Sequence, residues 1–95
     1  MFGTVGRFKV KPGKLDDVIA LMKSDTREVD GSIAYYIYKL EEKPDEGIIA
    51  VVFRDKKSYF ANADDPAQDA WYRKLVALLE APPTWEDGEI VHSGK

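Results

Sequence analysis

Residues 32–53 read SIAYYIYKLEEKPDEGIIAVVF and contain two strand-like segments joined by a polar stretch. The first segment, Ser32 to Leu40, is rich in β-branched and aromatic residues, and the second, Ile48 to Phe53, is a continuous apolar run. The intervening Glu41 to Gly47 is polar and includes a proline, a composition typical of a turn. The stretch therefore predicts an antiparallel hairpin with a long loop.

Both strands of this hairpin are apolar on both faces. Alternation divides the first strand into two sets of side chains, with Ile33, Tyr35 and Ile37 on one face and Ala34, Tyr36, Tyr38 and Leu40 on the other. If helices covered one face and water the other, apolar residues should alternate with polar ones. We therefore expect a second copy of the sheet to cover the open face, with any ligand in the hollow between the two copies.

The flanking sequence supplies a strand and a helix on one side of the hairpin. Phe2 to Val10 alternates as a strand, and after Lys11-Pro12-Gly13 the apolar residues fall at helical spacing as far as Val29. Asp30-Gly31 predicts the end of this helix, because glycine suits the left-handed position that follows a helix.

On the other side the pattern predicts two helices and a last strand. Lys56 to Ala63 predicts a short helix, and Asp65-Pro66 opens a longer one, with Asp65 as N-cap and Gln68 closing a capping box. Thr84 to Ser93 predicts a strand with a turn at Glu86-Asp87-Gly88. The order is that of a ferredoxin-like β-α-β-β-α-β fold of the α+β class, with an antiparallel sheet, in one domain spanning residues 1–95.

Composition excludes several classes of function. The 95 residues contain no cysteine and a single histidine, so thiolate chemistry and metal sites built on several imidazoles are excluded within one chain. We expect neither a metal nor another cofactor. The net charge is −3 and charges of both signs are interspersed, which is atypical of nucleic-acid binding. Without a signal peptide or a long apolar run, we expect a cytoplasmic protein that does not enter a membrane.

Three motifs give the chain a resemblance to the antibiotic biosynthesis monooxygenase (ABM) family of dimeric α+β barrels. They are Lys11-Pro12-Gly13 before the first helix, the passage Phe53-Arg54-Asp55-Lys56-Lys57-Ser58-Tyr59, and the ending Trp85-Glu86-Asp87-Gly88-Glu89. The resemblance covers nearly the whole chain. It implies a homodimer that binds a small aromatic or apolar ligand.

The resemblance also allows haem degradation to be tested residue by residue. Haem-degrading relatives use an asparagine on the first strand, a tryptophan on the helix after the third strand and a histidine ligand on the last helix. The matching positions here hold Gly6, Asn62 and Tyr72. Losing the imidazole removes the usual axial ligand of the iron, so haem degradation is disfavoured.

Quinone-forming relatives oxidise a hydroxylated polycyclic aromatic with oxygen and no cofactor, and they match in part. Tyr59 and, with a one-residue shift, Arg73 match their tyrosine and arginine, whereas Phe53 and Ile49 replace a tryptophan and an asparagine. The resemblance implies a cofactor-independent monooxygenase. The candidate catalytic residues are Tyr59, Arg73 and Tyr72, and the candidate substrate-binding residues are Asn62, Trp71, Phe53, Tyr36 and His92.

Structural explanations compete with these roles. Trp71 and Tyr72 share an amphipathic helix face with leucines and could belong to the core. Arg73 could be an exposed ion-paired side chain, Asn62 could end the short helix, and His92 near the C-terminus could face solvent. A non-catalytic dimeric barrel that binds a small apolar ligand is the alternative function.

Overall fold

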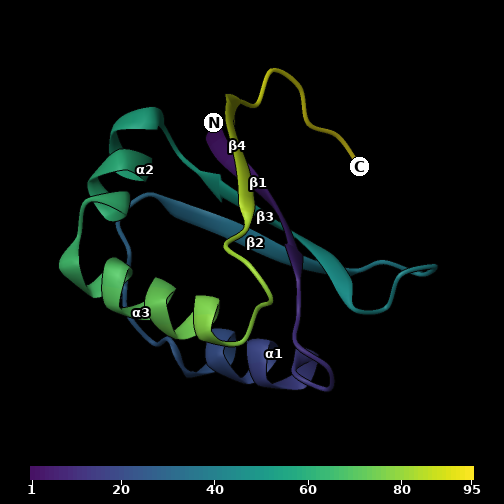
Figure 1. Cartoon of the computed structure of the whole chain (residues 1–95). Helices are drawn as coiled ribbons and strands as arrows, with labels where there is room; N and C mark the ends of the chain where they lie inside the picture. The colour runs from purple at the N-terminus through teal and green to yellow at the C-terminus, as the bar shows by residue number, and fades with distance from the viewer.

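The computed structural model describes residues 1–95, in which three helices cover one face of a four-stranded antiparallel sheet (Figure 1). The elements follow the chain as β1 (Phe2–Lys9), α1 (Leu15–Ser24), β2 (Ser32–Lys39), β3 (Glu46–Phe53), α2 (Lys56–Ala63), α3 (Pro66–Ala77) and β4 (Thr84–Glu89). In space the strands are ordered β2-β3-β1-β4. The predicted ferredoxin-like order, with a pair of helices between the last two strands, is confirmed.

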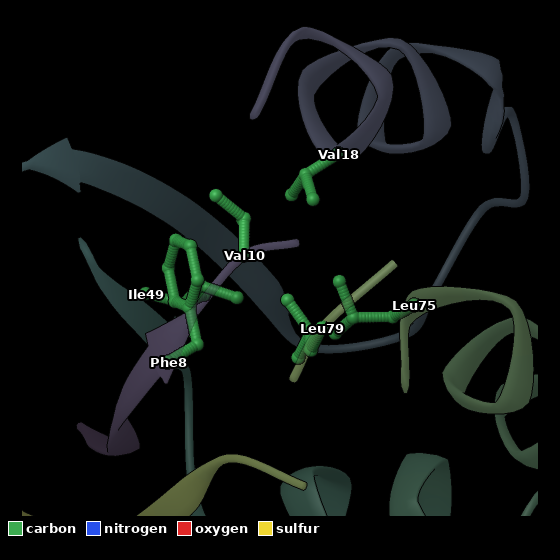
Figure 2. Close-up of a cluster of buried hydrophobic side chains, with 6 residues drawn as sticks. All are labelled: Phe8, Val10, Val18, Ile49, Leu75 and Leu79. Carbon is green, nitrogen blue, oxygen red and sulfur yellow. The ribbon is translucent and has the colours of Figure 1, made fainter. Parts of the chain in front are cut away.

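Alternation along β1 builds the helix-facing side of the sheet. Thr4, Gly6 and Phe8 are buried there, whereas Val5 and Arg7 between them are exposed. Val18 of α1 and Leu75 of α3 are fully buried against this face. Figure 2 shows the resulting core cluster, which consists of Phe8, Val10, Val18, Ile49, Leu75 and Leu79.

Aspartates fix the starts of α2 and α3. The side chain of Asp55 accepts from the backbone N–H of Ser58 at 2.8 Å, and that of Asp65 accepts from the N–H of Ala67 at 2.8 Å. Pro66 follows at the first helical position, as predicted. The expected capping box is not formed, because the Gln68 side chain turns away and accepts a hydrogen bond from the guanidinium of Arg27.

The local sequence pattern misplaces the end of one helix and predicts a turn that is not formed. Helix α1 ends at Ser24 instead of continuing to Val29, and residues 25–30 lead to β2 without regular structure. Gly31 does have a positive φ of 81°, but it stands at the entrance to β2 rather than at a helix end. The expected turn at residues 86–88 is also absent, because Glu86, Asp87 and Gly88 pair in register with β1.

The face of the sheet opposite the helices is open and largely apolar. Val5, Tyr36 and Tyr38 are half or more exposed on it, alongside the partly buried Ile48, Ala50 and Val52 of β3. Tyr36 and Val5 flank Ala50 in the strand pairing, which makes the apolar surface continuous across three strands. No helix is long and apolar enough to cross a membrane.

Candidate functional site

A cavity of about 720 Å³ lies between the helix-facing side of the sheet and the helices. Its volume falls within the usual range for small-molecule sites, and its lining mixes apolar and aromatic walls with a few polar groups. The cavity is formed within one chain. This corrects the expectation that the ligand space lies between two facing sheets, since the hollow is on the other side of the sheet.

Apolar and aromatic side chains from five elements line the cavity. They are Met22 of α1, Tyr35 of β2, Ile49, Val51 and Phe53 of β3, Trp71 and Tyr72 of α3, and Trp85 of β4. The aromatic rings among them provide flat surfaces on more than one side of the cavity. Such a lining suits a planar apolar ligand.

Tyr59 projects from α2 at one end of the cavity. Its ring packs against Phe2 and edge-on against Phe53, with ring centroids 5.2 and 5.5 Å apart. Its hydroxyl donates to Asp87 Oδ1 of β4 at 2.9 Å. Burial raises the pKa of the Tyr59 hydroxyl; the neighbouring Thr4 hydroxyl opposes that shift and the hydrogen bond to Asp87 adds to it. The phenol therefore stays protonated at neutral pH.

Trp71, Tyr72 and Trp85 bring further polar groups to the α3 side. The Trp85 Nε1–H points at the Tyr72 hydroxyl oxygen at 3.5 Å, which is a long hydrogen bond. Trp71 Nε1 is the one buried side-chain nitrogen or oxygen that has no hydrogen-bond partner. A buried donor without an acceptor is unfavourable, so this N–H is suited to an acceptor oxygen supplied by a ligand.

The segment between α1 and β2 borders the cavity and is tied to α3. Arg27 Nε and Nη2 donate to the two carboxylate oxygens of Asp25 at 2.9 and 2.7 Å, and Nη2 also donates to Gln68 Oε1 at 3.0 Å. The Arg27 guanidinium lowers the pKa of the Asp25 carboxyl. The one cation that lines the cavity is therefore already engaged.

The structure brings five of the eight predicted site residues to this cavity. They are Phe53, Tyr59, Asn62, Trp71 and Tyr72. Asn62 lies in the last turn of α2, where its carbonyl accepts from the N–H groups of Asp64 and Asp65, so its helix-ending position and its place in the cavity are compatible.

Three predicted residues do not line the cavity. Tyr36 is 57% exposed on the opposite, open face of the sheet. Arg73 is exposed on α3, where its Nε pairs with Asp69 Oδ2 at 3.0 Å, as the ion-pair explanation expects. His92 follows the end of β4 and is exposed. A role for Arg73 in stabilising an anion within this cavity therefore has no geometric support.

Sequence reasoning missed Thr4, Asp87 and Trp85 as cavity residues. Asp87 reads as a turn residue in Glu86-Asp87-Gly88, and only the pairing of β4 with β1 places it opposite Thr4. The alternation of β1 could have identified Thr4, because it is the one hydroxyl on an otherwise apolar face. No three histidine, aspartate or glutamate side chains are grouped so that they could hold a metal ion.

Comparisons with known proteins agree with this fold. Residues 1–74 match the family model described as antibiotic biosynthesis monooxygenase. Among solved structures, a protein from Chloroflexus aurantiacus described as an antibiotic biosynthesis monooxygenase has a TM-score of 0.80 at 20% identity, covering 99% of this chain and 96% of that one. A protein of the same description from Bordetella bronchiseptica has a TM-score of 0.81 at 14% identity, covering 96% and 97%.

A third similar structure is that of a variant of SnoaB, a cofactor-independent oxygenase from Streptomyces nogalater. It has a TM-score of 0.80 at 16% identity and covers 97% of this chain and 94% of that one. At these identities the likeness shows a shared fold. No significant match is found among curated proteins.

Proposed function

The chain belongs to the antibiotic biosynthesis monooxygenase family, and on that premise we propose that it oxidises a small hydroxylated aromatic with molecular oxygen and without a cofactor. The observation that carries the proposal is the aromatic cavity in which Tyr59, Asn62, Trp71 and Tyr72 converge. The fold shared with SnoaB, described as a cofactor-independent oxygenase, supports it.

The chemistry requires the protein to position the substrate, assist loss of a proton and stabilise the anion that reacts with oxygen. A hydroxylated aromatic that loses its phenolic proton becomes electron-rich enough at a ring carbon to react with oxygen directly. One oxygen atom enters the ring as a quinone carbonyl and the other leaves as water, so that one aromatic C–H becomes C=O for each oxygen molecule consumed.

The polar groups and aromatic walls of the cavity can meet these requirements. Trp71 Nε1–H and the Asn62 amide can donate hydrogen bonds to an oxygen that gains negative charge, and Tyr72 carries a hydroxyl proton for the same purpose. Thr4 of β1, Tyr59 of α2 and Asp87 of β4 provide acceptors elsewhere in the cavity lining. Flat aromatic walls hold the ring so that the reaction begins from an ordered complex.

Oxygen uptake tests this proposal. With a panel of naphthalenediols and hydroxylated anthrones, at least one compound should drive enzyme-dependent consumption of one oxygen molecule per quinone formed, above the rate of spontaneous oxidation. Tyr72→Phe should lower that rate without unfolding the protein. Uptake that never exceeds the protein-free rate would contradict the proposal.

A non-catalytic protein that binds a small apolar ligand is the second candidate. Two observations favour it: Ile49 and Phe53 make the β3 wall of the cavity apolar, and Arg73 lies outside the cavity. Tight binding of an aromatic without oxygen uptake would support this function over the first.

We further propose that the protein is a homodimer joined through the open face of the sheet. Only 13 of the 95 residues are buried in the isolated chain, and the continuous apolar surface around Val5, Ala50 and Tyr36 has no cover. A surface of this kind marks an interaction site, and a second copy packed sheet to sheet would bury it on both subunits.

A further inference from the structure

Two hydroxyl groups at one end of the cavity each have a protein acceptor within hydrogen-bond distance. Thr4 Oγ1 donates to the backbone carbonyl of Glu86 at 3.2 Å, and the Tyr59 hydroxyl donates to Asp87 Oδ1 at 2.9 Å. The Asp87 carboxylate has only acceptor oxygens. We call these three side chains, Thr4, Tyr59 and Asp87, the acceptor corner, because all three line the cavity and both hydroxyl groups have a protein acceptor for their proton.

The acceptor corner is held by the fold. Thr4 and Asp87 are cross-strand partners in the pairing of β1 with β4, so their side chains lie on the same face and close together. Tyr59 reaches them from α2, and its ring is fixed by Phe2 and Phe53. Burial and the Asp87 carboxylate keep the Tyr59 hydroxyl protonated and directed at Asp87. A ligand that accepted the Tyr59 proton would have to displace it from the Asp87 carboxylate.

The charged side chains around the cavity also disfavour an anionic ligand. Four carboxylates line it, those of Asp25, Glu28, Asp69 and Asp87. Asp25 is paired with Arg27 and Asp69 with Arg73, which leaves Glu28 and Asp87 without a cationic partner. The Arg27 guanidinium is bound by Asp25 and by Gln68 and is not available to a ligand. An anionic ligand would meet a negative potential and would find no free cation.

We propose that the acceptor corner selects an uncharged ligand that donates a hydroxyl proton to it, and that the cavity rejects aromatic carboxylates. The inference rests on the proposed function and narrows its substrate class to neutral hydroxyaromatics. It also assigns a specificity role to Asp87, which acts both as an acceptor and by holding the Tyr59 proton.

Equilibrium dialysis with three matched probes tests the inference through binding alone. 2-Naphthol carries the hydroxyl donor, 2-methoxynaphthalene keeps the oxygen but lacks the proton, and 2-naphthoate is anionic. For the unmodified protein we expect 2-naphthol to bind about tenfold more tightly than 2-methoxynaphthalene, the value of one hydrogen bond to a charged group. We expect 2-naphthoate to bind most weakly of the three.

Two variants at Asp87 test the role of the acceptor corner and leave the other residues of the cavity unchanged. Asp87→Ala frees the Tyr59 proton, and the nearly isosteric Asp87→Asn adds an amide donor while preserving the shape of β4. Both should bring the affinities of 2-naphthol and 2-methoxynaphthalene to within about threefold and should raise the affinity for 2-naphthoate. Glu41→Ala is the control, because it removes the same charge from the exposed β2–β3 loop, away from the cavity, and should leave all three affinities unchanged.

The possible failures are distinguishable. If 2-methoxynaphthalene or 2-naphthoate binds the unmodified protein as tightly as 2-naphthol, the selectivity inference is overturned while the aromatic site stands. The same holds if the preference survives in both Asp87 variants. If none of the three probes binds, the proposed function fails and the inference fails with it.

Discussion

The indole ring of Trp85 lies directly against Gly6, its cross-strand partner, so that a Cβ atom added to Gly6 would come within 2.3 Å of Trp85 Cζ3. The same ring is also tilted against that of Tyr72, with centroids 6.4 Å apart. The glycine is thus required by the close approach of an aromatic ring. The contact also gives a physical reason why position 6 does not carry the asparagine expected of a haem-degrading relative.

Gly6→Ala should lower the free energy of unfolding by about 1–3 kcal/mol, because the added methyl group forces the Trp85 ring out of its place. Urea unfolding measures the effect. In a Trp85→Leu background the same substitution should be better tolerated, since the obstructing ring is gone. Equal losses in the two backgrounds would show that Trp85 is not the obstacle.

Trp71→Phe should weaken ligand binding without weakening the fold. The substitution removes the buried N–H that has no partner and keeps an aromatic ring in place, so the free energy of unfolding should fall by less than about 1 kcal/mol or should rise. Binding of 2-acetylnaphthalene, which offers a carbonyl oxygen, should weaken about fivefold, whereas 2-ethylnaphthalene should be unaffected. A large loss of stability would mean that this N–H supports the apo protein.

Asp55 should contribute to acid sensitivity through the start of α2. Hydrogen bonds from Ser58 and from Arg54 lower the pKa of Asp55 from 3.8 to about 2. Because the folded-state pKa is the lower one, the stabilisation is complete above about pH 4 and is lost as the pH falls towards 2.

The matched pair Asp55→Asn and Asp55→Ala isolates this effect. Asparagine can still cap the helix but does not titrate, so this variant should lose less stability between pH 5 and pH 2.5 than the unmodified protein does. Alanine removes the cap and should be less stable at every pH. Parallel stability curves for all three proteins in urea would contradict the assignment.

Val5→Glu should disrupt the proposed dimer. Val5 lies at the centre of the open face, paired with Ala50 on one side and Glu86 on the other, and burying an unpaired carboxylate there is strongly unfavourable. We expect sedimentation of the unmodified protein at micromolar concentration to give a dimer, and the dissociation constant of Val5→Glu to rise at least about 100-fold. Val91→Glu makes the same change at a 90% exposed site beyond β4 and should remain dimeric. A folded, monomeric unmodified protein would refute the proposed dimer.

Much of the fold was predictable because local signals agreed with the tertiary structure. The alternation of β1 identified its buried face, and Asp65-Pro66 located the start of α3. The end of α1 was mispredicted because Thr26 and Val29 continue the helical spacing, whereas the chain leaves the helix after Ser24. Arg27, which binds both Asp25 and Gln68, holds this segment in its non-helical path, and such contacts are not visible in a local pattern.

The site was predictable only in part, for a related reason. Aromatic residues on α2 and α3 could be nominated from the resemblance and their helical positions, and Tyr59, Trp71 and Tyr72 do line the cavity. Asp87 could not, because an Asp-Gly pair indicates a turn until its pairing with β1 is known. Strands that are apolar on both faces also leave open which face encloses the cavity, so the ligand space was placed on the wrong side of the sheet.

A crystal structure of the protein with 2-naphthol tests the central claim most directly. The account predicts one ring per chain between the sheet and α3, in contact with Trp71 and Tyr72, with its hydroxyl within hydrogen-bond distance of Tyr59 or Asp87. Density for the ligand on the open face of the sheet, with the cavity between Tyr59 and Trp71 empty, would contradict it.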